Sequence, residues 1–288
     1  MYKIALTLLM SLPLSSMALD KAIYGKDSRL DINDSLSSVH KTLGKSVAAM
    51  IPRYAAIPDF LATTTSAYTT EFMSISLAEN RDVCDSDRYA HQQAVATCTG
   101  FLVSPTHLVT AGHCVKTMDD CQDNFWVFDY KLKTEKASNV GAIANSAIYQ
   151  CKKIVATKLT VFTKQDWAVI ELDRPVKDRA PLKLSKNSPS KNDAVFVIGT
   201  PSGTPLKVAT GKTRSKHFNY FKTNLDTFGG NSGSPVFDAQ NEVAGILVRG
   251  DVDYEAAGRC VSATYYGENT GRGEDVSYIK PVRSLLKL

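Results

Sequence analysis

The sequence predicts an all-β protein, either a sandwich or a barrel, with one short helix at the C-terminus. Its apolar residues fall in short runs rich in Val, Ile, Phe and Tyr. Turn residues such as Ser104–Thr106 and Pro201–Pro205 separate several of these runs. Short strands with frequent turns are typical of sandwiches and barrels, whereas βαβ folds alternate strands with longer helical segments. The 288 residues suffice for one domain or for two fused halves.

The expected strands are short, and β-branched or aromatic residues are frequent in them. In chain order they are Ser46–Ile51, Cys98–Val103, Leu108–Thr110, Phe125–Phe128, Trp167–Leu172, Ala194–Ile198, Ser234–Phe237 and Val243–Val248. The last stretch, Ser277–Leu288, has Val282, Leu285 and Leu286 at helical spacing, which predicts the terminal helix.

The first residues have the pattern of a secretory signal peptide. Lys3 supplies a positive charge, and the apolar run Ile4–Leu14 is too short to span a bilayer in the usual way. Small residues precede a cleavage point after Ala18, so we expect residues 1–18 to be removed and the mature protein to be secreted or periplasmic. An uncut membrane anchor is the alternative. Residues 19–44 are polar and form either an N-terminal arm or a propeptide.

The charge and the cysteines exclude several classes of protein. The net charge of +5 is mild, and Lys and Arg are scattered without an aromatic-interleaved basic tract, which argues against nucleic-acid binding. The cysteine count is even, and export leads to an oxidising compartment, so disulfides are favoured over a zinc site. We expect no cofactor and no metal. The cysteines are Cys84, Cys98, Cys114, Cys121, Cys151 and Cys260.

The segment Thr110–Cys114 places a histidine directly before a cysteine, just after an expected strand. Cys98 lies sixteen residues before Cys114, and a bridge between them would close a strand–turn–strand and fix the backbone beside His113. A disulfide that closes a loop of this length stabilises the fold by about 3 kcal/mol in the chain-entropy model. It also limits how far the imidazole drifts, which matters because a misplaced base slows a reaction steeply.

The segment Phe228–Pro235 places Ser232 between glycines. Glycines let the chain turn tightly, present the hydroxyl and direct backbone N–H groups at one point. The N–H groups of Gly230 and Ser232 would form an oxyanion hole, which stabilises the charge that develops on a substrate carbonyl oxygen. Alone, this segment could equally be a simple turn.

Asp166 opens the apolar run that ends at Leu172. An Asp in such a place is common, and its value comes from its order between His113 and Ser232. A buried Asp can accept from the imidazole N–H, hold the correct tautomer and stabilise the imidazolium. We therefore predict Ser232 as nucleophile, His113 as base and Asp166 as orienting acid.

In combination, these motifs resemble the chymotrypsin/trypsin clan of serine peptidases. The resemblance is carried by Cys98–Val103 with Thr110–Cys114, then Asp166–Val169, then Gly230–Pro235, in the family's order of His, Asp and Ser. It implies two antiparallel six-stranded β-barrels with the site in the cleft between them. It also implies a secreted serine endopeptidase that works by acyl-enzyme chemistry.

The resemblance suggests a peptidase domain over residues 45–288. The first barrel would span about 45–175 and the second about 176–288. We expect a monomer that acts on protein or peptide substrates, with no nucleic-acid partner and no membrane contact after signal cleavage. A catalytically inactive homologue that acts as a binding protein is the alternative, and the presence of all the motif residues argues against it.

Asn231 stands where animal trypsins carry an Asp that pairs with a freshly cut N-terminus, so that activation switch is expected to be absent. The Gly-Asn-Ser-Gly-Ser-Pro form resembles bacterial enzymes, among them the glutamyl endopeptidases. Ala22–Arg29 also resembles the start of those mature enzymes, which favours an N-terminal arm over a long propeptide.

Asp226 lies six residues before Ser232, where trypsin has the Asp at the base of its S1 pocket. An Asp there would favour a Lys or Arg at P1 through a charge-assisted contact. The alternative interpretation is a structural Asp that accepts hydrogen bonds from loop amides.

The other candidate substrate-binding residues leave P1 specificity open. Thr227 matches the glutamyl type, but Leu247 stands where glutamyl endopeptidases place a His. Val248, Arg249 and Gly250 would form a pocket wall, and Arg249 could pair with Asp226 or attract an acidic residue. Lys or Arg is the first expectation for P1, and glutamyl-type or narrow specificity is the alternative.

Four cysteines remain after Cys98 and Cys114 are paired, and four allow three pairings. Cys121 and Cys151 flank an expected strand and could staple it, which would leave Cys84 to join Cys260. The other pairings stay open.

Overall fold

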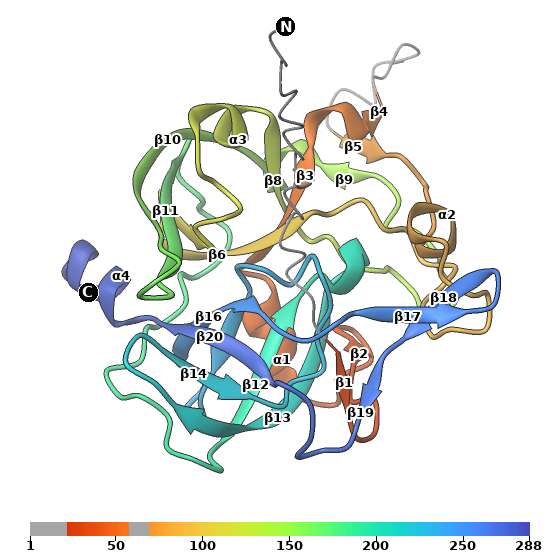
Figure 1. Ribbon diagram of the computed structural model, residues 1–288. Coiled ribbons are helices and arrows are strands. Elements are labelled where there is room, and N and C mark those ends of the chain that lie inside the picture. Colours follow the sequence, from red (N-terminus) through yellow and green to blue (C-terminus); the bar gives the residue numbers. More distant parts are fainter. Residues whose placement is uncertain (1–21, 58–68) are drawn as a thin grey trace, which may run out of the picture.

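The computed structural model describes residues 22–57 and 69–288 as two β-barrels packed against each other (Figure 1). Strands from the first half of the chain form the barrel at the top of the view, and strands from the second half form the barrel below. Both are six-stranded and antiparallel, which confirms the expected fold class. The predicted signal peptide and residues 19–21 of the predicted arm lie outside the described residues.

The first barrel has the strand order β10-β11-β7-β6-β3-β8 and closes where β8 pairs with β10. Its strands are β3 (Val47–Pro52), β6 (Cys98–Ser104), β7 (His107–Thr110), β8 (Asn124–Phe128), β10 (Ile148–Leu159) and β11 (Asp166–Leu172). Phe101 of β6 and Trp126 and Phe128 of β8 are fully buried. Burying an apolar side chain of this size contributes about 1.5–3 kcal/mol, which explains why these runs form buried strands.

The second barrel has the order β12-β15-β16-β20-β14-β13 and closes where β13 pairs with β12. Its strands are β12 (Ala194–Gly199), β13 (Lys207–Lys216), β14 (Tyr220–Thr223), β15 (Pro235–Phe237), β16 (Val243–Arg249) and β20 (Glu274–Tyr278). Its core contains Phe221, Leu225 and Leu247, all fully buried. The chain passes to this barrel after β11, so residues of β11 and β16 can meet only across the junction.

Short elements surround the barrels. The strands are β1 (Ile23–Tyr24), β2 (Leu30–Asp31), β4 (Ala56–Ile57), β5 (Thr69–Phe72), β9 (Ile143–Ala144), β17 (Tyr254–Ala257), β18 (Cys260–Ala263) and β19 (Tyr265–Tyr266). The helices are α1 (Ser38–Gly44), α2 (Leu77–Arg81), α3 (Met118–Gln122) and α4 (Lys280–Leu286). Helix α4 is the expected terminal helix. Within the described ranges, no helix has the length and apolar character needed to cross a bilayer.

Three disulfides join the six cysteines. One of them, Cys98–Cys114, ties β6 to the residue after His113. The other two are Cys121–Cys151, which ties α3 to β10, and Cys84–Cys260, which ties a loop of the first half to β18. The pairing is the one that the cysteine positions suggested.

The N-terminal segment packs on the second barrel. Its strand β1 pairs with β19, and β2 pairs with β13. Lys207 of β13 is fully buried, and its Nζ contacts Asp31 Oδ1 and Gln92 Oε1 at 2.6 Å each. Burial lowers the pKa of Lys207 to about 8, although Asp31 acts in the opposite direction. A buried ion pair therefore fastens this segment to the barrel.

Candidate active site

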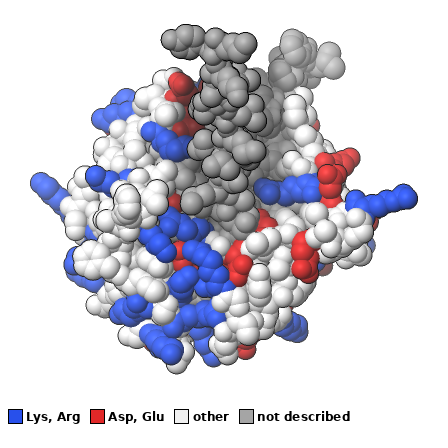
Figure 2. All heavy atoms as spheres, in the orientation of Figure 1, with Lys and Arg blue, Asp and Glu red and all other residues white. Residues whose placement is uncertain are grey.

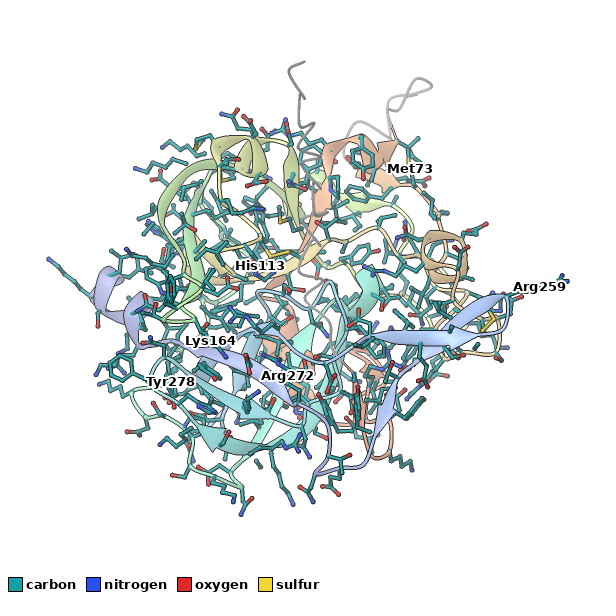
Figure 3. The ribbon with its side chains drawn as sticks, viewed as in Figure 1. Met73, His113, Lys164, Arg259, Arg272 and Tyr278 are labelled. Atoms are coloured by element: carbon teal, nitrogen blue, oxygen red, sulfur yellow. A yellow bond between two sulfur atoms is a disulfide. The ribbon has the colours of Figure 1, made fainter. Side chains whose placement is uncertain are left out.

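His113 lies just beyond β7, near the level at which the two barrels meet (Figure 3). Its Nδ1 is 2.8 Å from Asp166 Oδ2, and its backbone N–H donates to Asp166 Oδ1 at 3.1 Å. Gly112 precedes it because a Cβ there would come within 2.2 Å of the Lys158 carbonyl oxygen on β10. The segment thus passes tightly along the β10–β11 hairpin and brings the histidine to the carboxylate.

Asp166 is the first residue of β11 and is fully buried. Burial by itself raises the pKa of this carboxyl, but the hydrogen bonds from His113 and the nearby charge of Arg249 outweigh it and hold the pKa below its usual value. The carboxylate is therefore ionised near neutral pH and is held in place by contacts on both of its oxygens.

Arg249 ends β16 in the second barrel, and its Nη2 donates to Asp166 Oδ2 at 3.2 Å. The sequence had suggested Asp226 as its partner or an acidic substrate residue as its target. The structure instead places the guanidinium beside Asp166, so the end of β16 lies within side-chain reach of the start of β11. The Oδ2 atom of Asp166 thus contacts both His113 of the first barrel and the Arg249 guanidinium of the second barrel.

The loop that carries Ser232 is held from the first barrel. Thr99 of β6 donates its backbone N–H to the Ser232 carbonyl and its hydroxyl to the Gly230 carbonyl, each at 2.8 Å. Gly230 and Gly233 have φ of +97° and +90°, which favours glycine. A Cβ on Gly233 would also come within 2.0 Å of the Thr99 carbonyl oxygen. The flanking glycines therefore allow the close approach of this loop to β6.

The peptide between Gly229 and Gly230 has a fixed orientation. The Gly229 carbonyl accepts from the Ser202 N–H, and the N–H and C=O of a trans peptide point in opposite directions. The N–H of Gly230 therefore points away from Ser202.

Ser232 lies beside the segment that carries His113. Its Oγ is 3.5 Å from the Val248 carbonyl oxygen, and its own carbonyl oxygen is 3.7 Å from the Cys114 sulfur. Val248 directly precedes Arg249 on β16. The structure therefore brings the segments of the predicted triad to one junction, with residues from both barrels around them.

A family model for a trypsin-like peptidase domain matches residues 98–246, which is more than half of the chain. The chain belongs to the trypsin-like peptidase family. It is a serine endopeptidase by this membership, as the motifs implied.

Two solved structures are similar to this trypsin-like peptidase. One is a Glu endopeptidase in complex with MPD, at 14% identity and a TM-score of 0.54, covering 92% of this chain and 97% of that one. The other is the inactive form of a Ser-to-Ala mutant of a protein from M. tuberculosis H37Rv, at 14% identity and a TM-score of 0.47, covering 88% of this chain and 90% of that one. At 14% identity the Glu endopeptidase supports the fold alone.

In this trypsin-like peptidase, Asp226 is buried and faces the N-terminal segment. One oxygen accepts from the Tyr24 N–H at 2.7 Å, and the other accepts from the N–H and hydroxyl of Ser28 at 2.7 and 2.6 Å. Burial raises the pKa of Asp226, while these hydrogen bonds oppose the rise. Such contacts fit the alternative interpretation, in which Asp226 is a structural residue that accepts hydrogen bonds from loop amides.

A second carboxylate, Glu274, lies among the predicted pocket residues. Its Oε2 accepts from the Thr227 hydroxyl at 2.7 Å, and its Oε1 accepts from the Tyr24 hydroxyl at 2.9 Å. A Cβ on Gly250 would come within 2.1 Å of Glu274 Oε2. Glycine at position 250 therefore leaves the space that the carboxylate of Glu274 occupies.

Cys98, His113 and Cys114 form a compact group whose candidate ligand atoms lie within 4.8 Å of one another. A zinc site with cysteine ligands needs thiolates. Both sulfurs here belong to the Cys98–Cys114 disulfide, so they cannot supply them.

Two residues of this site went unnoticed in the sequence. Thr99 lies within the motif that begins at Cys98, so its position was the available signal. Glu274 has no local pattern, since its partners Tyr24 and Thr227 are far from it in the chain. Only the barrel topology brings it to Thr227, a predicted pocket residue.

Proposed function

We propose that this peptidase is secreted or periplasmic and hydrolyses protein peptide bonds through an acyl-enzyme on Ser232. His113 takes the Ser232 proton during attack on the substrate carbonyl and passes it to the leaving amine, and water then releases the acyl group. The observation that carries the proposal is the twofold contact of His113 with Asp166. When the Nδ1–H of His113 donates to Asp166, the ring keeps Nε2 as the acceptor for the Ser232 proton.

The N–H groups of Gly230 and Ser232 serve as the oxyanion hole in this proposal. Two features support it. The Gly230 N–H points away from Ser202, and the Ser232 N–H points away from Ser234, whose N–H binds the Asn231 carbonyl of the same peptide. Donors fixed before the reaction need no rearrangement as charge develops on the substrate oxygen.

A fluorophosphonate probe tests the nucleophile. We expect the wild-type chain to form a covalent adduct and to hydrolyse casein, and Ser232→Ala to do neither. Peptide mapping by mass spectrometry should locate the adduct on Ser232, and His113→Ala should label far more slowly because the base is lost. A wild-type chain that fails to react, or a Ser232→Ala variant that still reacts, contradicts the proposal.

Arg249 acts in this proposal as a positioning residue. Its guanidinium contacts Asp166 Oδ2, the same oxygen that faces His113 Nδ1. It therefore fixes the carboxylate that orients the base, and its charge helps to hold the pKa of Asp166 below its usual value. A role in binding an acidic P1 side chain is disfavoured because the guanidinium is already engaged.

Arg249→Gln and Arg249→Lys test this role by steady-state kinetics across pH. We expect Arg249→Gln to lower kcat about tenfold with a smaller change in KM. Loss of the cation raises the pKa of Asp166, so the acid limb of kcat/KM should move to higher pH. Arg249→Lys keeps the charge and should restore part of kcat and the position of that limb. A rise in KM with kcat unchanged would instead assign Arg249 to substrate binding.

For P1, we propose Lys or Arg, with Glu274 rather than Asp226 as the charged partner. Both carboxylates accept hydrogen bonds, but those of Glu274 come from Thr227, a predicted pocket residue, and from Tyr24, and its carboxylate occupies the space beside Gly250. The oxygens of Asp226 face Tyr24 and Ser28 of the N-terminal segment. A carboxylate in this place favours a cationic side chain and repels an acidic one.

A panel of chromogenic peptides that differ only at P1 tests this assignment. We expect Arg and Lys substrates to be preferred over Glu and Phe. Glu274→Gln, which keeps the size of the side chain, should lower kcat/KM for the Arg substrate by about tenfold or more while that for Phe changes little. Asp226→Asn is the matched control and should keep the Arg preference. A preference of the wild type for Glu would overturn basic specificity, and loss of Arg preference in Asp226→Asn alone would return the role to Asp226.

Residues 22–44 remain attached to the mature protein in this proposal. Ala22 and Ile23 are fully buried, and Tyr24 hydrogen-bonds to both Asp226 and Glu274. Removal of this segment would leave two buried carboxylates without these partners, which is costly.

A further inference from the structure

Two neighbouring hairpin tips expose large apolar side chains to solvent. Phe162 and Val161, in the turn between β10 and β11, are 100% and 77% exposed, and Leu159 at the end of β10 is 48% exposed. Phe218, in the turn between β13 and β14, is 95% exposed. We call these four residues the hairpin-tip surface. Single exposed apolar residues are ordinary, but such a group usually marks an interaction site.

The two tips are joined although they belong to different barrels. The Asn219 side-chain amide donates to the Thr163 carbonyl at 2.8 Å. Lys164 Nζ contacts the Tyr220 hydroxyl at 3.4 Å, and the His217 ring stacks on the Tyr220 ring with centroids 4.4 Å apart. These contacts involve the immediate neighbours of Phe162 and Phe218, so the apolar side chains stand on one joined structure.

The surroundings of the hairpin-tip surface are basic. Residues 152–165 and 211–224 together contain eight Lys or Arg and no Asp or Glu. Lys158, Lys164 and Lys216 are exposed, and none of them forms an ion pair within the part of the chain that the structure describes. Figure 2 shows Lys and Arg outnumbering acidic residues over the lower left of this face, where β13 and β14 lie in Figure 1.

We propose that the hairpin-tip surface docks on an anionic lipid membrane. Side chains that protrude from two turns can insert among lipids without a shaped partner, whereas a protein partner needs a complementary cavity for each. The lysines beside them match anionic headgroups, each contributing about 1 kcal/mol near a charged bilayer. Apolar insertion and basic attraction together are the two signals that stable peripheral binding requires.

Docking in this way would hold the candidate active site close to the lipid. Asp166 follows the β10–β11 turn directly, and its partner Leu159 belongs to the hairpin-tip surface. The proposal differs from the sequence-based expectation of no membrane contact. It does not depend on the proposed function, since the surface uses none of the triad residues.

Vesicle co-sedimentation tests the proposal with the secreted chain carrying Ser232→Ala, which excludes self-cleavage. One set of vesicles is phosphatidylcholine alone, and the other contains about 30% phosphatidylglycerol. We expect binding to the anionic vesicles, weakened when NaCl rises from about 0.1 M to about 0.5 M. Phe162→Ser with Phe218→Ser should lower the partition coefficient by about tenfold or more.

The matched control is Leu36→Ser with Tyr54→Ser, which removes two apolar side chains that are 103% and 78% exposed elsewhere. This control should bind like its parent, and near-UV circular dichroism should show that both double variants are folded. Absence of vesicle binding, equal binding to neutral vesicles, or equal binding by the Phe162/Phe218 variant overturns the proposal. The same Phe substitutions are also made in the wild-type chain, which keeps Ser232. If they slow the cleavage of casein but not of short peptides, and vesicles are not bound, the surface serves protein substrates and the lipid proposal is wrong.

Discussion

The buried carboxylate of Asp166 is the point on which the arrangement of this protein depends. A charge without water needs partners, because an uncompensated buried carboxylate costs several kcal/mol. His113 supplies two contacts from the first barrel, and Arg249 supplies one from the second. The cost of burying Asp166 is therefore offset only when both barrels are in place. The same contact set that closes the junction also orients the imidazole.

Thr99 plays a similar part for the Ser232 loop. It lies on β6 of the first barrel and binds two carbonyls of a loop in the second. The Cys98–Cys114 disulfide lies next to Thr99 on one strand and next to His113 on the other segment. One covalent bond thus limits the movement of the two segments that must meet during the proposed reaction. We expect the site to keep its shape without a substrate, since its contacts are within the chain.

Much of this could be predicted from the sequence, because the decisive signals are local. Short apolar runs with turn residues gave the strands, and glycines around Ser232 marked a tight loop that the structure explains by close approach to Thr99. The features that the sequence does not predict depend on tertiary contacts. Asp226 matched a pocket position by its spacing, but spacing does not show that Tyr24 and Ser28 face its oxygens. The sequence predicts Arg249 near the pocket wall, but its contact with Asp166 on the other barrel emerges only from the tertiary structure.

The N-terminal segment contacts both carboxylates of the region that we propose to set specificity. Tyr24 alone donates to both buried carboxylates, through its backbone N–H to Asp226 and through its hydroxyl to Glu274. In the specificity that we propose, residues that precede the first barrel therefore help to hold the carboxylate that selects the substrate.

The kinetics of Asp166→Asn test the central claim most directly, because Asn keeps the shape of the side chain and removes its charge. The account predicts a fall in kcat of about ten-thousand-fold for a peptide substrate, since the amide no longer holds the imidazole in the required tautomer. Circular dichroism should show an intact fold. A variant that is folded and retains activity within about tenfold of the wild type would contradict the claim that Asp166 orients the catalytic base.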